Sequence, residues 1–319
     1  MNNTAQALTV PDRRTGDTAP RRPPRLQAYA PQSFFAVSAV FHYLGPAFAV
    51  LLFAHLDVLG VAWLRIATAA AVFAVWRRPW RLLARGDRRG LMLLAQLGAV
   101  LAAMNVLFYL AVARLPLATV GAIEFLGVVL LATAGAKTPR NAAALALTVC
   151  GVAALADLRL AGQPLGFACA FGNCALFVLY VVLGHRVANN DAGTATGAMS
   201  GIDQLGAAML VAAVAVTPVG LGGALAAFAH PVLLLAGVGV GLCSSVIPYV
   251  TDQLAMARLP RASFALLLAL LPMLGTIIGA IVLRQPPTGQ DLLGIALVVA
   301  GVALHQVPAH ERLRRDATV

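Results

Sequence analysis

The chain has 319 residues, of which 60% are hydrophobic and 11% are charged, and its net charge is +11. A soluble domain carries about 25% charged residues, so this composition excludes an ordinary water-soluble fold. It suits a protein whose outer surface faces lipid.

The first 31 residues are polar and contain five arginines among prolines, which predicts a disordered basic tail. An arginine-rich tail can mimic an organelle transit peptide, but the apolar stretch that follows directly favours a cytoplasmic tail. Residues 308–319 form a second basic tail at the other end of the chain.

Apolar stretches fill the sequence between the tails, and each can cross a bilayer, because a spanning helix needs about 20 apolar residues. Leu, Ala and Val dominate them, without the alternating pattern of a membrane barrel. Helices then remain as the way to satisfy backbone groups in lipid. The sequence predicts an all-α membrane protein with ten transmembrane helices, at 33–54, 58–76, 90–113, 115–136, 140–157, 164–185, 195–217, 231–254, 262–283 and 289–307.

The basic residues cluster in alternate loops, which indicates membrane orientation rather than binding of nucleic acid. With the N-terminus inside, nineteen Lys and Arg residues lie on the inner side and three on the outer side, and Arg65 falls within a stretch. This asymmetry predicts that both termini face the cytoplasm and that the number of helices is even.

An internal repeat is visible in the turns that precede the fourth and ninth predicted helices. Residues 111–120 read AVARLPLATV and residues 255–264 read AMARLPRASF. A spacing of five helices makes the two copies enter the membrane in opposite senses, as in transporters built from inverted repeats. We therefore expect two inverted five-helix repeats, at 32–157 and 158–307.

Several polar side chains fall inside the predicted helices, where charges are expensive unless they pair or line a pathway. Arg65 could hold a solute carboxylate through two parallel hydrogen bonds, or it could pair with Glu124 or a carbonyl of another helix. Glu124, between Gly121 and Gly127, could bind a solute ammonium group, carry a proton, or serve as the partner of Arg65.

Three further polar residues are candidates with open alternatives. Asp203 could line a pathway for protons, whereas Asp252 lies near a helix end, where it could bind solute or simply reach water. Asn105 could hydrogen-bond solute or bridge two helices. The candidate solute-binding residues are thus Arg65, Asn105, Glu124 and Asp252, and the candidate proton or pathway residues are Glu124 and Asp203.

Catalytic, metal and cofactor sites are not indicated. The four cysteines lie in apolar stretches without CxxC spacing, and neither an HExxH nor a GxSxG motif occurs. An intramembrane enzyme and a lipid-handling scaffold stay as alternatives to a transporter. The sequence leaves open whether the chain forms a homodimer.

The segment Met104–Leu126, MNVLFYLAVARLPLATVGAIEFL, resembles the drug/metabolite transporter superfamily. Within it, the chain is most similar to EamA-type exporters such as the bacterial threonine/homoserine exporter. Trp63-Leu64-Arg65, Ile247-Pro248-Tyr249 and Arg258-Leu259-Pro260 fit the same pattern, as do Asp252, Phe264, Pro272 and Arg186. The resemblance covers about residues 33–307.

The resemblance implies a ten-helix inner-membrane protein that exports small amino acids or related metabolites, driven by the proton gradient. Its partners are then a small solute, protons and membrane lipid. Two positions depart from the pattern: Leu271 stands where the family usually has Glu before Pro272, and Arg284-Gln285 replaces a usual Gly-Glu. A different solute or a different coupling would follow if those glutamates mattered.

Overall fold

The computed structural model describes residues 25–81, 88–135, 138–156, 163–190, 197–256 and 271–304. The chain divides into two compact units, Met1–Ala30 and Pro31–Val319. Of the first unit, the described residues 25–30 belong to the first helix.

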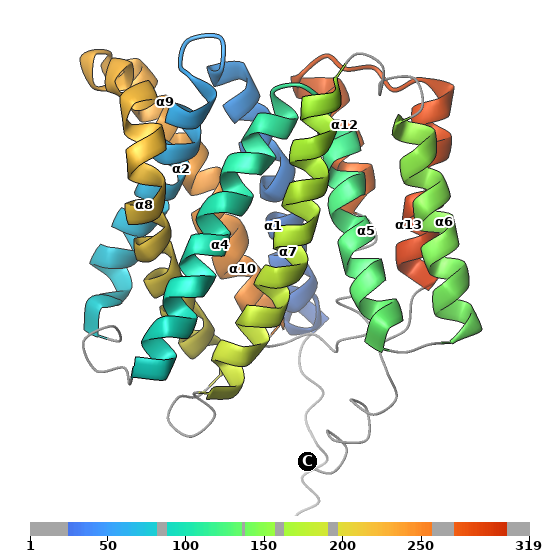
Figure 1. Ribbon diagram of the computed structural model, residues 1–319, viewed down its shortest axis with the longest axis horizontal. Coiled ribbons are helices and arrows are strands. Elements are labelled where there is room, and N and C mark those ends of the chain that lie inside the picture. The colour runs from blue at the N-terminus through green and yellow to red at the C-terminus, as the bar shows by residue number, and fades with distance from the viewer. Residues whose placement is uncertain are drawn as a thin grey trace, which may run out of the picture. The chain divides into compact units, whose positions relative to one another are not determined.

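Helices make up the described part of the chain, which contains no strand (Figure 1). The elements α9, η1 and α10 follow one another directly, and η1 is a π-helical turn. In chain order the elements are α1 (Arg25–Leu52), α2 (Val58–Arg77), α4 (Arg88–Val112), α5 (Leu117–Gly135), α6 (Pro139–Ala156), α7 (Pro164–Asn190), α8 (Gly197–Ala229), α9 (Pro231–Gly241), η1 (Leu242–Val246), α10 (Ile247–Met256), α12 (Leu271–Val282) and α13 (Gly289–Leu304).

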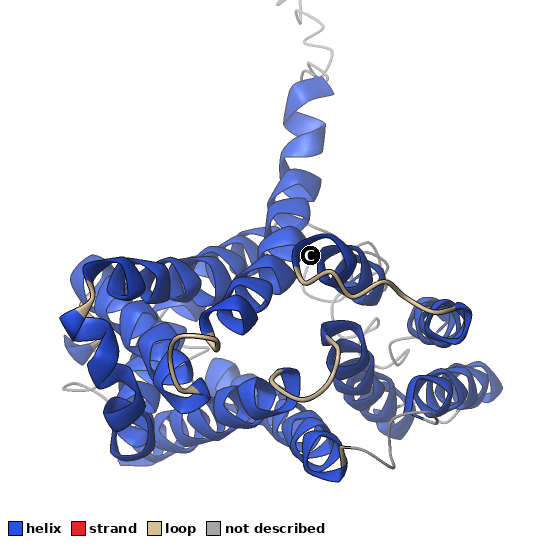
Figure 2. Cartoon of the chain, turned by 90° about the horizontal axis from the view of Figure 1, so that it is seen from above, coloured by secondary structure: helices blue, strands red, loops and turns tan. Residues whose placement is uncertain are grey.

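Six of these helices are long and apolar enough to cross a membrane, and four shorter apolar helices accompany them. Each predicted apolar stretch corresponds to one of these helices, although residues 262–270 of the ninth stretch lie outside the described residues. Figure 2 shows most helices nearly end-on, so their axes are roughly aligned with one another. The prediction of an all-α membrane protein is confirmed.

Two helix boundaries differ from the prediction. The helix α1 begins at Arg25, directly after two prolines, so the last residues of the predicted disordered tail are helical. The helix α8 continues through Pro218, where the sequence predicted an end at residue 217. The Thr217 hydroxyl bonds to the Ala213 carbonyl one turn back, beside the backbone donor that Pro218 lacks.

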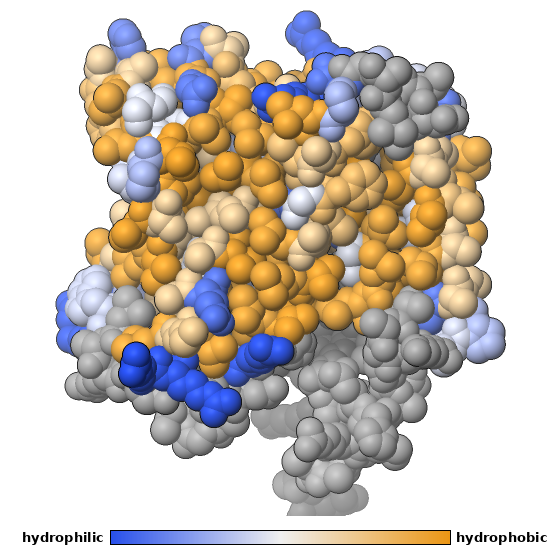
Figure 3. Space-filling model, in the orientation of Figure 1, coloured by the Kyte–Doolittle hydropathy of each residue, from blue (hydrophilic) through white to orange (hydrophobic). Residues whose placement is uncertain are grey.

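The outer surface matches a lipid environment. Figure 3 shows a broad apolar band with hydrophilic residues gathered toward its two edges. Large apolar side chains are exposed within the described helices, among them Val75 at 82%, Val214 at 75% and Ile281 at 74%. Such exposure is unfavourable in water and neutral in lipid, so the chain is a multi-pass membrane protein.

Two helix pairs pack through glycine at backbone distance. A Cβ on Gly60 of α2 would collide with the Gly223 carbonyl of α8, and one on Gly151 of α6 would lie 2.6 Å from the Gly294 carbonyl of α13. The helices α2 and α8 run antiparallel, because Arg77 at the end of α2 bonds to Asp203 near the beginning of α8. In each pair, helices that lie far apart in sequence form one tight unit (Figure 1).

We predict that Gly60→Ala destabilises the folded protein by about 1–3 kcal/mol, because the new methyl group overpacks the contact between α2 and α8. Thermal unfolding of the purified protein in detergent measures the change.

Gly222→Ala is the matched control, since a Cβ there meets nothing within 4 Å. It should leave stability unchanged or raise it by up to about 1 kcal/mol, as expected for Gly to Ala in a helix. Equal melting of the two variants would contradict the glycine contact.

Candidate functional site

Arg65 lies in the middle of α2, and its residue is only 7% exposed. The helices α2 and α9 meet closely beside it, since a Cβ on Gly241 would lie 2.6 Å from Cβ of Thr68. This approach brings the Arg65 guanidinium against η1. Its Nε donates to Oγ of Ser245 at 2.9 Å, and its Nη2 donates to the Ser244 carbonyl at 3.1 Å.

The Ser244 carbonyl can accept this bond because of Pro248. A backbone carbonyl in an α-helix normally accepts from the N–H four residues later, and proline has no N–H. The local π-helical turn fits the same interruption, since such turns appear where the regular ladder is broken. Pro248 therefore exposes a carbonyl that the buried charge of Arg65 uses.

Tyr109 of α4 covers the other side of this cation. The Arg65 Cζ atom lies 5.3 Å from the centre of the Tyr109 ring, which is cation–π distance. Tyr109 is fully buried, and neither its hydroxyl nor Oγ of Ser244 has a hydrogen-bond partner. An unpaired buried polar group costs about 1–3 kcal/mol, so two of them beside a buried cation suggest a ligand.

Asn105 lies one turn before Tyr109 on α4 and is 2% exposed. Its Nδ2 donates to the Leu101 carbonyl of the same helix at 2.7 Å. The amide therefore bonds within α4, and no hydrogen bond joins it to another of the described helices.

Glu124 of α5 faces the space between α1 and α7. A Cβ on Gly121, one turn before it, would lie 2.6 Å from the Tyr43 hydroxyl of α1, and one on Gly127, one turn after it, would lie 3.0 Å from Sγ of Cys174 on α7. Glu124 itself is half-buried. Its carboxylate is close enough to interact electrostatically with Arg65, but no ion pair or hydrogen bond joins the two side chains.

Asn173 of α7 is a further buried polar residue without a hydrogen-bond partner. It is 1% exposed, and neither amide atom has a hydrogen-bond partner. Gly166, seven residues earlier on the same face of α7, packs on Leu115 between α4 and α5. Asn173 therefore faces α4 and α5 rather than lipid.

Contacts between helices place these groups at nearly one height. Gly127 meets Cys174, and Gly172 meets Leu107, so Asn173 lies level with Glu124 and with the middle of α4. Arg65 reaches Tyr109 in the same part of α4. The structure thus gathers polar groups from α2, α4, α5, α7 and η1 at mid-helix, and we call this set the polar centre: Arg65, Asn105, Tyr109, Glu124, Asn173, Ser244 and Ser245.

Asp252 lies one turn after Pro248 on α10, close to Ser38 of α1. The Ser38 hydroxyl donates to the Pro248 carbonyl at 3.3 Å. Asp252 interacts electrostatically with Tyr180 of α7 as well. It is therefore placed between α1 and α7, beside the polar centre.

Asp203 has a different environment. Its two oxygens accept from Nε of Arg77 at 2.6 Å and from Nη2 of Arg77 at 3.0 Å. The two side chains are 31% and 20% exposed, at the end of α2. Asp203 thus ties α8 to α2 through a bidentate ion pair, a role that the sequence did not indicate.

The sequence reasoning missed Tyr109, Ser244 and Ser245. The usable signal was the spacing of Ser244 and Pro248, because a proline four residues after a serine frees that serine's carbonyl. No comparable signal identified Tyr109.

The positions that depart from the family pattern have plain structural roles. Leu271 is 5% exposed and packs in the apolar core. Arg284 follows α12 in the left-handed conformation, with φ of 53°, where glycine is the commonest residue. The Gln285 side chain folds back toward Gly279 at the end of α12.

A bundle of apolar helices around buried, partly unpaired polar groups is the arrangement expected of a membrane transport protein. No family model matches the chain. The threonine/homoserine exporters RhtA of Salmonella typhimurium LT2 and Escherichia coli K12 are each 30% identical to it over 262 residues, which cover 80% of this chain and 84% of each exporter. A solved crystal structure, 19% identical, matches with a TM-score of 0.55 and covers 86% of this chain and 97% of its own.

The chain therefore belongs to the EamA-type transporters of the drug/metabolite transporter superfamily, the family of these exporters. The relatives are transporters and not enzymes.

We predict that Asn173→Leu raises the free energy of unfolding by about 1–3 kcal/mol, because it replaces an unpaired buried amide with an apolar side chain of similar size. Chemical or thermal unfolding in detergent measures this change.

Asn105→Leu is the matched comparison, since it removes an amide that does have a partner. It should not stabilise the protein. A loss of stability in Asn173→Leu equal to that in Asn105→Leu would show that the Asn173 amide is satisfied.

Proposed function

We propose that this protein is a secondary transporter that exports small amino acids or related metabolites across the cytoplasmic membrane. The observation that carries the proposal is the buried guanidinium of Arg65, which has five donors and uses two of them in the hydrogen bonds to Ser245 and Ser244. The similarity to proteins named as threonine/homoserine exporters supports the solute class.

The polar centre offers complementary groups for both ends of an amino acid. The remaining donors of Arg65 bind the solute carboxylate, for which a guanidinium is well shaped. Glu124 binds the ammonium group, and the unpaired Tyr109 hydroxyl, Ser244 hydroxyl and Asn173 amide accept or donate to the remaining polar atoms. Asn105 and Asp252 complete the binding region from α4 and α10.

Glu124 is the proposed proton carrier. It is half-buried between glycines and forms no ion pair with any of the described cations, so protonation breaks no salt bridge among the described residues. Asp203 is less suited to this step, because its carboxylate is already bound by Arg77. Proton binding and solute binding then compete for one carboxylate, which couples the two.

Alternating access would follow from two inverted repeats, at residues 32–157 and 158–307. In that arrangement α2 corresponds to α8 and α6 corresponds to α13, and both pairs pack antiparallel in the described structure. The second copy of the repeated turn lies mostly outside the described residues. The distribution of Lys and Arg supports cytoplasmic termini.

Arg65→Ala should lower solute flux at least roughly tenfold, because it removes a charged hydrogen bond of about 1.5 kcal/mol or more to the solute. Efflux from proteoliposomes preloaded with labelled threonine or homoserine measures the loss, with the amount of inserted protein quantified in parallel.

Arg140→Ala is the control, since Arg140 bonds to the Leu304 carbonyl at the end of the bundle. It should transport normally. Wild-type flux in Arg65→Ala would exclude Arg65 from solute binding and remove the main support for the proposal.

Glu124→Gln should abolish acceleration of flux by an imposed pH gradient while solute-for-solute exchange persists, because an amide cannot carry the proton. The measurement compares flux with and without the gradient in the same liposomes. Asp203→Asn should keep the response, and a Glu124→Gln variant that still responds to the gradient would rule out Glu124 as the carrier.

A further inference from the structure

His42 lies in the middle of α1, on the side that faces the other helices. The exposed apolar side chains of α1 include Val40, Phe48 and Leu51, which form its lipid-facing stripe. With about 3.6 residues per turn, His42 falls on the opposite side of the helix from this stripe. His42 is nevertheless half-buried and not fully buried. Its imidazole therefore borders open space inside the bundle, not lipid.

The neighbouring turns of α1 show what His42 faces. One turn before it, the Ser38 hydroxyl donates to the Pro248 carbonyl at 3.3 Å. One turn after it, a Cβ on Gly45 would lie 2.6 Å from the Ser244 backbone nitrogen. Residues spaced by three or four positions share one face of a helix, so Ser38, His42 and Gly45 face the same way. His42 therefore lies between these two contacts, beside η1.

The imidazole of His42 is also close to the charge of the polar centre. It interacts electrostatically with Arg65, which η1 binds from the side of α2. No hydrogen bond joins its ring nitrogens to any residue that the structure describes. A neutral imidazole has one donor nitrogen and one acceptor nitrogen. His42 thus adds an unused donor and an unused acceptor beside the polar centre.

The Ser244 hydroxyl faces the same side of α1. A Cβ on Gly45, one turn from His42, would meet its Oγ, and this hydroxyl has no hydrogen-bond partner. Together, a neutral imidazole and a serine hydroxyl can accept one hydrogen bond and donate another. This combination suits a neutral hydroxyl group, which itself donates one hydrogen bond and accepts another.

We propose that His42 and Ser244 bind a hydroxyl group on the side chain of the solute, an inference that rests on the proposed export function. Arg65 and Glu124 bind the carboxylate and the ammonium group, which all amino acids share, so they cannot distinguish side chains. A site that hydrogen-bonds a hydroxyl discriminates against a solute without one, because its own polar groups are then left unpaired. His42 is therefore a specificity-determining residue for hydroxylated amino acids.

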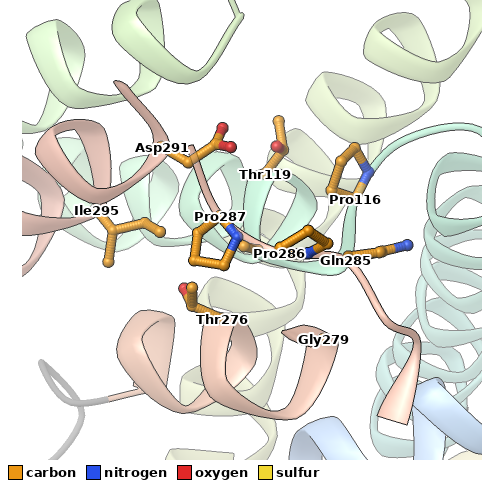
Figure 4. A pocket seen from close by; sticks show the side chains of 10 residues that line it. Pro116, Thr119, Thr276, Gly279, Gln285, Pro286, Pro287, Asp291 and Ile295 are labelled. Atoms are coloured by element: carbon orange, nitrogen blue, oxygen red, sulfur yellow. The ribbon is translucent and has the colours of Figure 1, made fainter. Parts of the chain in front are cut away.

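A second space in the bundle does not suit this role. The pocket between α5, α12 and α13 has a cavity volume of about 40 Å³, and residues of the polar centre are not among those that line it (Figure 4). Such a volume matches one or two water molecules, since each occupies about 30 Å³ in the liquid. A solute held by Arg65 therefore places its side chain elsewhere, and the open space beside His42 is available.

The test compares threonine with valine, which has a methyl group in place of the hydroxyl and nearly the same size. Proteoliposomes that contain the full-length protein are loaded with one or the other labelled amino acid below saturation, and efflux is measured per amount of inserted protein. We expect the wild-type protein to favour threonine by roughly three- to tenfold, the factor that one hydrogen bond supplies.

Variants assign this preference to the two residues. His42→Phe keeps a flat ring without nitrogens and should bring the threonine-to-valine ratio close to one, whereas His42→Gln keeps a donor and an acceptor and should retain at least half of the preference. Ser244→Ala should lower the ratio while the backbone carbonyl still binds Arg65. His55→Phe is the matched control, since His55 is exposed beyond the end of α1, and it should leave the ratio unchanged.

The outcomes separate this inference from the export proposal. Equal efflux of threonine and valine through the wild-type protein would overturn the inference and leave export intact. No efflux of either amino acid would overturn both. An unchanged ratio in His42→Phe would exclude His42 from the site. If that variant does not insert, an unchanged ratio in Ser244→Ala would overturn the shared hydroxyl site.

Discussion

The buried positive charge of Arg65 is the constraint around which the described helices are arranged. A guanidinium at mid-helix in a membrane protein must be solvated by protein groups, because lipid offers none. Ser245, the Ser244 carbonyl and the Tyr109 ring supply that solvation. Each comes from an element other than α2, so the charge holds α2, α4 and η1 in register.

Glycine and proline make this solvation feasible. A Cβ on Gly45 of α1 would lie 2.6 Å from the Ser244 backbone nitrogen, so α1 meets η1 at backbone distance. Gly241 lets α9 approach α2, and Pro248 frees the carbonyl that Arg65 uses. Residues that weaken a helix in isolation therefore stabilise the bundle here, because they place backbone polar groups where a charge needs them.

The charged residues discussed here differ in whether they form an ion pair. Asp203 and Arg77 neutralise one another by a bidentate contact at the end of α2, which is partly exposed. Arg65 and Glu124 lie deeper and stay unpaired with each other, while hydroxyl and amide groups beside them lack partners. Unpaired polar groups make the polar centre less stable than a fully hydrogen-bonded region would be. Proteins tolerate such a cost in stability at sites that function requires.

The helices could be predicted from the sequence because length and apolar composition decide whether a segment spans a bilayer. The end of α8 could not, because the helix continues past the predicted stop at residue 217 and through Pro218, and a proline is tolerated where a neighbouring hydroxyl bonds the backbone. Arg65 and Glu124 were found as candidates because charges are rare in apolar stretches. The roles of Tyr109 and Asp203 could not be predicted, because they depend on how other helices pack. Tyr109 covers Arg65, and Asp203 binds Arg77.

The glycine contacts also limit how the bundle can move. The pairs α2–α8 and α6–α13 each join a helix of one proposed repeat to a helix of the other, with backbones in close contact. Separating the repeats as rigid bodies would break both pairs. A rearrangement during transport is less costly at η1, where the regular hydrogen-bond ladder is already interrupted beside Pro248. The group that solvates Arg65 thus lies at this interruption, so in the proposed mechanism solute binding at the polar centre would be linked to movement of α10.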